Sequence, residues 1–183
     1  MTKILIPLAD GVEELEAVSI VDTLRRGGCE VVTASVKTGA NNRTIAGSRG
    51  VRFLADADWP AQATSFDAVV VPGGMGNVTV LAQDPRVLSC VADLAKAGKM
   101  TAAICAGPLV LQAAGALAGK KATCHPGVRE KLTGAAYSAD RVVVDGQVVT
   151  SQGPGTAIEF ALTILRLLRG TRIAEQVAQA MVA

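Results

Sequence analysis

The sequence predicts an α/β protein in which a mostly parallel β-sheet is covered by helices on both faces. Short runs rich in Val, Ile and Ala alternate along the chain with longer stretches of helical periodicity. Several runs, such as Phe66–Val71, are apolar at almost every position, which is typical of parallel strands buried on both faces. The 183 residues, half of them hydrophobic, are enough for one sizeable core, so we expect a single domain over residues 1–183.

The N-terminal half contains three of the expected strands and two helices. A helix is predicted over Glu13–Arg26, and a second begins at Asp84-Pro85 and runs to about Lys96, because proline is favoured in a first helical turn. The strands are the β-branched or apolar runs Lys3–Ala9, Cys29–Val36 and Phe66–Val71.

The C-terminal half continues the alternation and adds a hairpin. Asp145-Gly146-Gln147 suits a tight turn between the strands Val142–Val144 and Val148–Thr150. The other expected elements are a strand and three helices, at Met100–Ile104, Pro108–Leu117, Ala157–Leu168 (ending at Gly170) and Arg172–Val182.

Composition argues against a nucleic-acid-binding surface and against a membrane protein. The net charge is only +2, basic residues are scattered among acids, and aromatic residues make up 3%. The stretch Thr101–Gly119 carries no charge and is almost long enough to cross a bilayer as a helix. However, Gly107-Pro108 interrupts it and no aromatic belt flanks it. We therefore interpret it as a buried strand and helix, and the short N-terminal apolar run followed by acids favours a cytoplasmic protein.

Neither a metal nor an organic cofactor is expected. The four cysteines lie far apart without a C-x-x-C pair, and His125 is the only histidine, so no zinc-ligand spacing is present. The glycine-rich stretch at 73–76 lacks the full G-x-G-x-x-G spacing of a dinucleotide site. We expect reduced thiols, with Cys29 and Cys124 in the core and Cys90 packed on a helix.

Three segments far apart in the sequence follow predicted strands and are expected to meet at the carboxyl edge of the sheet, where α/β proteins bind ligands. They are Asp10–Glu16, Pro72–Gly76 and Cys105–Pro108. Cys105 stands at a strand-to-helix turn, so it is either a small buried residue or a nucleophile whose pKa the following helix lowers. The Gly-Pro after it and the companion loops favour the nucleophile.

Each neighbour of Cys105 has a structural and a functional interpretation. Glu13, Glu14 and Glu16 complement the helix dipole, or one of them faces the thiol, and helical periodicity does not choose among them. Gly73 and Gly74 form a turn, offer amides to an oxyanion, or do both. His125 is a structural residue or the imidazole of a thiol–imidazole pair at the end of another strand.

Taken together, VEELE, VVVPGG, AAICAGP, a strand ending in His-Pro, and TSQGPGTAIEFAL resemble the DJ-1/ThiJ/PfpI superfamily, closest to the DJ-1 branch with the bacterial YajL-like proteins. The resemblance implies a flavodoxin-like three-layer sandwich and a homodimer packed partly through the first helix. It matches the reactive cysteine to Cys105, its carboxyl partner to Glu16 and the histidine to His125. It matches the pocket amides to Gly74 and Ala106, arginines near the site and dimer interface to Arg26 and Arg49, and an acid supplied by the partner subunit to Asp22.

The activities implied by this resemblance need no cofactor. They include conversion of glyoxal or methylglyoxal to hydroxy acids, and deglycation of early adducts on proteins and nucleotides. Other members are described as oxidative-stress sensors or chaperones, in which the same thiol is oxidised to a sulfinate. A peptidase is the least favoured activity, because Ala106 stands where the peptidase branch has a histidine.

Overall fold

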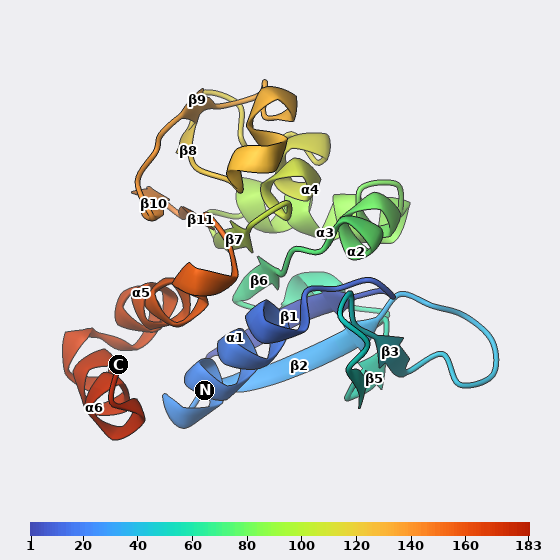
Figure 1. Cartoon of the computed structure of the whole chain (residues 1–183), viewed down its shortest axis with the longest axis horizontal. Coiled ribbons are helices and arrows are strands. Elements are labelled where there is room, and N and C mark those ends of the chain that lie inside the picture. Colours follow the sequence, from blue (N-terminus) through green and yellow to red (C-terminus); the bar gives the residue numbers. More distant parts are fainter.

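The computed structural model describes all 183 residues and confirms the predicted α/β architecture (Figure 1). The central sheet has seven strands in the order β10-β11-β7-β6-β1-β2-β5. All its neighbouring strands are parallel except β10 and β11, which form the predicted hairpin. Its strands are β1 Lys3–Leu8, β2 Glu30–Ser35, β5 Ala57–Asp58, β6 Ala68–Val71, β7 Met100–Ile104, β10 Val142–Asp145 and β11 Val148–Ser151.

Two small sheets flank the central one. An antiparallel pair is formed by β3 Thr44–Ala46 and β4 Arg52–Leu54, and a parallel pair by β8 Lys121–Ala122 and β9 Ala136–Tyr137. Of these strands, β8 lies at the start of the strand expected before His125 but is shorter than expected. The strands β3, β4, β9 and β5 were not predicted, because two or three residues are too few to show a hydrophobic period.

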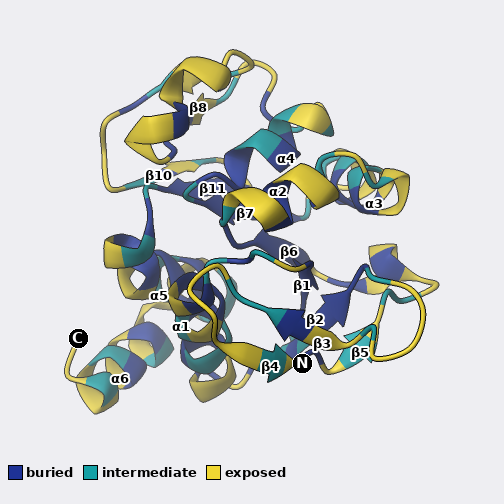
Figure 2. Ribbon diagram, turned by 45° about the vertical axis from the view of Figure 1, so that its right-hand side comes forward, coloured by how far each residue is buried: buried dark blue, intermediate teal, exposed yellow.

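Helices cover both faces of the sheet and divide the core into two layers. The first layer packs against α1 Glu14–Arg26, α5 Ala157–Arg169 and α6 Thr171–Met181, and the second against α2 Met75–Leu81, α3 Pro85–Lys96 and α4 Pro108–Ala113. In β1, Ile4 and Ile6 belong to the first layer and Leu5 to the second, as expected for a strand buried on both faces. Figure 2 shows the result, with buried strands between helices whose outer faces are exposed.

The helix predictions needed two corrections. The helix at α2 was missed because MGNVTVL contains a glycine, an asparagine and three β-branched residues, all poor helix formers. The helix from Pro108 ends at Ala113 rather than Leu117, since Gly115 adopts a positive φ of 76° that ends it.

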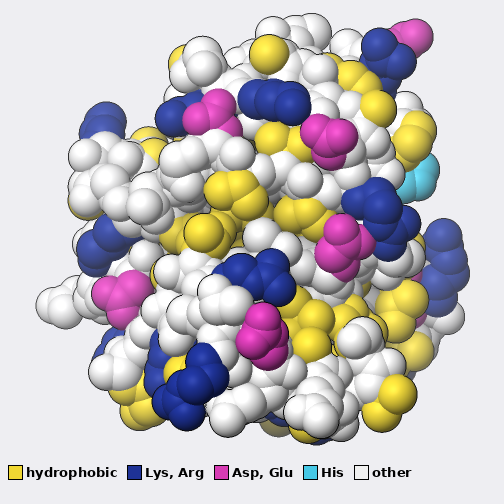
Figure 3. Space-filling model, turned by 90° about the vertical axis from the view of Figure 1, so that its left-hand side faces the viewer, with side chains coloured by type: hydrophobic (Ala, Val, Ile, Leu, Met, Phe, Trp, Pro, Cys, Tyr) yellow, Lys and Arg dark blue, Asp and Glu magenta, His cyan; other side chains and the backbone are white.

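The stretch Thr101–Gly119 lies in the fold as interpreted, with β7 fully buried and α4 packed in the second core layer. No helix of the structure combines the length and apolarity needed to cross a bilayer. On the side carrying α5 and α6, Figure 3 shows hydrophobic side chains among basic and acidic ones, with no continuous basic area on that face.

Candidate active site

A cavity of about 390 Å³ lies at the carboxyl ends of the central strands, where the sequence places the three candidate loops. Cys105 and His125 both line it, together with Glu13, Gly74 and Ala106 from the three predicted segments. Arg49 reaches the same cavity from the loop between β3 and β4. The structure therefore brings most of the predicted site residues to one place.

Cys105 occupies a strained elbow directly after β7. Its φ is +64°, and only Asn41 and Val182 share a positive φ among the non-glycine residues. Hydrogen bonds hold its backbone on both sides, because its N–H donates to the Ser151 carbonyl (2.9 Å) and its carbonyl accepts from the His125 N–H (2.9 Å). Cys105 is half-buried, whereas the other three cysteines are buried, so it is the thiol open to a ligand.

Glu16 is the carboxyl group that faces this thiol. It is fully buried on α1, and its Oε2 accepts a hydrogen bond of 2.7 Å from the Gly73 N–H. Burial raises the pKa of Glu16 to about 7, although the Gly73 bond and the contact with Cys105 act in the opposite direction. The structure thus distinguishes Glu16 from its two neighbours, a choice that helical periodicity left open.

The pKa of the Cys105 thiol is raised rather than lowered, so the predicted lowering by the following helix is outweighed by other groups. Burial and the ionised carboxylate of Glu16 raise this pKa to about 12, and they outweigh the N–H groups of Ala106 and Gly74 that lower it. The helix that follows, α4, has only six residues, so its dipole is weak. A proton on Glu16 removes the repulsion, so the thiolate is favoured when the carboxyl is neutral.

The other two acids of the VEELE segment support the local structure. Glu13 caps α1, and its side chain accepts from the Glu16 N–H at 2.8 Å, which is the predicted structural role of first-turn acids. Glu14 is buried and hydrogen-bonded to the loop of residues 47–51.

Gly73 and Gly74 differ in what they offer to a ligand. The N–H of Gly73 is buried and occupied by Glu16, so its predicted role as a substrate-binding amide is wrong. Gly74 lines the cavity with a φ of +86°, and its backbone N–H and that of Ala106 act to lower the pKa of the Cys105 thiol. A Cβ on Gly73 would come within 2.6 Å of the Cys105 Cβ, which explains the glycine.

His125 lies in the cavity but is not hydrogen-bonded to the thiol, so the predicted thiol–imidazole pair is absent in this state. It follows β8 by three residues instead of ending a strand. Its Nδ1 accepts from the Gly127 N–H at 3.0 Å, which leaves Nε2 free to donate to a ligand.

Arg49 and Arg26 are placed very differently. Arg26 does not line the cavity. It ends α1, ten residues or about 15 Å beyond Glu16, and pairs with Asp22 (Nε to Oδ2, 2.7 Å). Its assignment as a substrate-binding residue of its own chain is therefore wrong, while Arg49 lies at the cavity as predicted.

Asn77 is a site-supporting residue that the sequence analysis missed. It is fully buried on α2, where its Oδ1 accepts from the Ala9 N–H (2.7 Å) and its Nδ2 donates to the Pro72 carbonyl (3.0 Å). It thereby ties the end of β1 to the loop that follows β6. A lone polar residue between apolar ones was the available signal, but it has meaning only once α2 is recognised.

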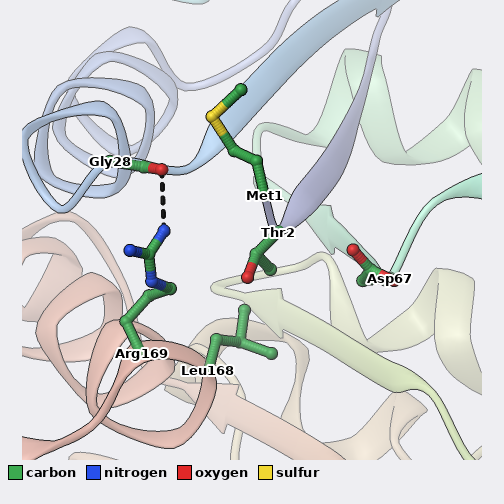
Figure 4. A pocket seen from close by; sticks show the side chains of 6 residues that line it. All are labelled: Met1, Thr2, Gly28, Asp67, Leu168 and Arg169. Atoms are coloured by element: carbon green, nitrogen blue, oxygen red, sulfur yellow. Dashed lines mark hydrogen bonds between the residues drawn. The ribbon is translucent and has the colours of Figure 1, made fainter.

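A larger, open cavity at the opposite ends of the strands has no comparable chemistry. Met1, Thr2, Asp67 and Leu168 line it, and Arg169 donates from Nη1 to the Gly28 carbonyl at 2.8 Å (Figure 4). No nucleophile lines it, and no group of three or more His, Cys, Asp or Glu side chains anywhere in the structure could hold a metal ion.

The fold and this site define a class: flavodoxin-like α/β proteins with a cysteine on a strand-to-helix elbow beside a buried carboxyl group. Residues 2–167 match the DJ-1/PfpI family, and the chain belongs to that family. The solved structure of Drosophila melanogaster DJ-1beta superposes with a TM-score of 0.91 at 36% identity, covering 100% of this chain and 98% of that one. Oxidized Toxoplasma gondii DJ-1 gives 0.93 at 38% identity, with 100% and 98% covered.

Curated relatives place the chain with homologues of the DJ-1 branch. Protein DJ-1 homolog B of Arabidopsis thaliana is 40% identical over 97% of this chain, which spans only 40% of that longer protein. The glutathione-independent glyoxalase DJR-1.2 of Caenorhabditis elegans is 39% identical, with 91% of this chain and 88% of that protein covered.

Proposed function

We propose that this protein is a cofactor-independent cysteine enzyme that converts methylglyoxal or glyoxal to hydroxy acids. It would act in the cytoplasm as a YajL-like bacterial member of the family, in defence against carbonyl stress. One observation carries the proposal: a half-buried thiol on a strained elbow that faces a buried carboxyl group with a pKa of about 7.

The reaction begins with addition of the Cys105 thiolate to the aldehyde carbon, which forms a carbon–sulfur bond and a hemithioacetal. The N–H groups of Gly74 and Ala106 stabilise the oxyanion as it develops. A base takes the proton from the former aldehyde carbon and returns one to the neighbouring carbonyl carbon. This oxidises the first carbon and reduces the second without any external reagent. Water then hydrolyses the thioester, releasing lactate and restoring the thiol.

Glu16 is suited to carry that proton. In its neutral form it accompanies the thiolate and gives its proton to the oxyanion, and the resulting carboxylate then accepts the proton from carbon and returns it, which a pKa of about 7 allows near neutral pH. His125 is the alternative base, or the donor that orients the substrate carbonyl through its free Nε2. The name of the Caenorhabditis elegans relative, a glutathione-independent glyoxalase, supports this chemistry. Apparent deglycation of proteins and nucleotides would follow from it by mass action, because free methylglyoxal is consumed.

The proposal is tested by following lactate formation from methylglyoxal by NMR in thiol-free buffer. We expect lactate from the wild type and none from the Cys105→Ser variant. A Cys90→Ser variant serves as the control, because Cys90 lies on the buried face of α3 and its pKa is raised to about 11. Absence of lactate from a folded, reduced wild type would overturn the proposal.

The second candidate is a redox sensor or stress chaperone without turnover, in which Cys105 is oxidised to a sulfinate. The observation that favours it is again local: Cys105 is the one cysteine that is not buried, and a solved relative is described as oxidized. Mass spectrometry of Cys105 after graded peroxide treatment, beside the lactate measurement, distinguishes the two. Sulfinate formation without lactate production favours the sensor.

A further inference from the structure

The loop of residues 47–51 connects β3 to β4 and carries Arg49 to the cavity that contains Cys105. Its ends are held by backbone bonds, from the Gly47 N–H to the Val51 carbonyl (2.8 Å) and from the Ser48 N–H to the Val12 carbonyl (2.8 Å). These bonds close the loop but leave the N–H of Arg49 to be satisfied by another group.

Glu14 supplies that group from the first turn of α1. Its Oε1 accepts from the N–H of Arg49 (2.8 Å) and from that of Val51 (3.2 Å), and its Oε2 accepts from the Ser48 hydroxyl (3.1 Å). Glu14 is buried, and backbone and hydroxyl donors hold its pKa below the ordinary value although burial acts against them. It therefore stays ionised at the pH where the site would work.

The fit between Glu14 and the loop is tight. A Cβ built on Gly47 would lie 2.6 Å from the Glu14 carboxyl carbon, so the loop backbone is in direct contact with the acid. Because Glu14 stands two residues before Glu16, one turn of α1 fixes both the loop with Arg49 and the carboxyl group facing the thiol.

The Arg49 guanidinium is left without an acidic partner. None of the eight ion pairs in the structure includes it, and its one hydrogen bond is a long contact of 3.4 Å from Nη1 to the neighbouring Ser48 carbonyl. An unpaired guanidinium whose backbone is anchored at the cavity that contains the nucleophile favours ligands with a carboxylate or phosphate group.

We propose that Glu14 is a positioning residue that holds Arg49 at the cavity, and that the pair makes the site select carbonyl compounds bearing a negative charge. This inference extends the proposed enzyme's substrates from neutral methylglyoxal to carbonyl compounds that also carry a carboxylate or phosphate group, and it rests on the same cavity and thiol. Glu14 acts only through the loop, whereas Arg49 contacts the anionic group itself.

The test measures the alkylation rates of Cys105 by iodoacetate and by the neutral iodoacetamide, followed at the Cys105 peptide by mass spectrometry. Both reagents form the same carbon–sulfur bond and release iodide, so the ratio of their rates reports the charge at the cavity. We expect Arg49→Gln to lower the iodoacetate-to-iodoacetamide ratio by about threefold to tenfold, the size of one charge interaction at short range. Glu14→Ala should lower it similarly, and the double variant should lower it no further.

Two matched variants separate positioning from general effects. Glu14→Gln keeps an oxygen for the two loop N–H groups and should preserve the wild-type ratio, while Arg52→Gln removes a nearby charge from β4 outside the cavity and should also preserve it. An unchanged ratio in Glu14→Ala, or additive effects in the double variant, would overturn the inference. Alkylation needs no turnover, so a failed lactate assay leaves this test unaffected.

Discussion

The carboxyl group of Glu16 and the thiol of Cys105 meet beside Gly73, close enough for the charge of the carboxylate to raise the pKa of the thiol. A Cβ on Gly73 would lie 2.7 Å from the Glu16 Oε2 and 3.0 Å from the Cys105 sulfur, so both groups converge on this one glycine. Burial raises the pKa of each group, and an ionised Glu16 raises that of the thiol further. The reactive form is therefore the one in which the carboxyl group is protonated and the thiol is not.

Replacing Glu16 with glutamine should simplify the titration of Cys105. In the wild type we expect the pair to lose its first proton near pH 7 and its second near pH 12. In Glu16→Gln the thiol should titrate alone, with a pKa below about 12 because the carboxylate repulsion is gone. Lactate formation should fall by about a hundredfold or more with loss of the base.

Thiolate absorbance in the ultraviolet measures this titration, and Cys105→Ser gives the background from the three buried cysteines. Identical thiol titration and peroxide sensitivity in wild type and Glu16→Gln would disprove the pairing of the two residues.

The raised pKa of Glu16 also predicts how stability depends on pH. Below about pH 4.5 the carboxyl is protonated in both the folded and unfolded states, so it has no effect. Between about 4.5 and about 7 only the unfolded state ionises, so the free energy of unfolding falls as pH rises, by about 3 kcal/mol at most. Glu16→Gln should lack this loss and become more stable than wild type above this range.

Glu14→Gln is the control with the opposite sign. In the wild type the fold lowers the pKa of the Glu14 carboxyl. The ionised carboxylate therefore stabilises the protein at pH values above its ordinary pKa, and this contribution is lost as the pH falls through the lowered pKa. Urea unfolding of the three proteins across this pH range measures both effects. A stability difference between wild type and Glu16→Gln that stays constant with pH would contradict the assignment.

Gly73→Ala should disturb the site without removing any functional group. The new Cβ would overlap Cys105 and Glu16, and overpacking of this kind destabilises by about 1–3 kcal/mol. We expect lactate formation to be lost, because the thiol and the carboxyl must move apart. Gly155→Ala is the matched control, since nothing lies within 4 Å of its added Cβ and its φ is not positive. Equal activity of the two variants would show that the close approach at Gly73 is unimportant.

Periodicity and strand-end reasoning predicted the parts of this protein that depend on local sequence. The buried runs at β1, β6 and β7 and the turn at Asp145-Gly146 were confirmed because each carries its signal within a few residues. The convergence of three loops followed from the parallel sheet alone. The choice of Glu16 did not, because burial of one glutamate among three depends on how α1 packs against the loop after β6.

What the sequence could not reveal depends on contacts between distant segments. Arg49 reaches the cavity because Glu14, 35 positions earlier, anchors its loop. The raised pKa of Cys105 arises from burial and from an acid on another element, which outweigh the local helix dipole used for the prediction. Asn77 acts across 68 positions, on the N–H of Ala9.

Asn77→Ala should therefore weaken the connection between β1 and the glycine loop. The buried N–H of Ala9 would lose its acceptor, which costs about 1–3 kcal/mol of stability. Asn42→Ala is the control. It removes an exposed hydrogen bond to Asp58 and should lower the free energy of unfolding by much less than Asn77→Ala does. Urea unfolding of both variants makes the comparison, and equal losses would show that the buried bridge is not special.

The predicted homodimer can be tested through α1, whose Leu15 and Val18 side chains are 56% and 53% exposed. Val18→Asp adds a charge to that face without disturbing the core, so we expect the wild type to be a dimer and this variant a monomer in light scattering. If Asp22 of one subunit completes the site of the other, lactate formation should fall with the dimer. Val80→Asp is the control, because Val80 is 45% exposed on α2, which covers the face of the sheet opposite to α1. This variant should remain a dimer. A monomeric wild type, or a dimeric Val18→Asp, would contradict packing through α1.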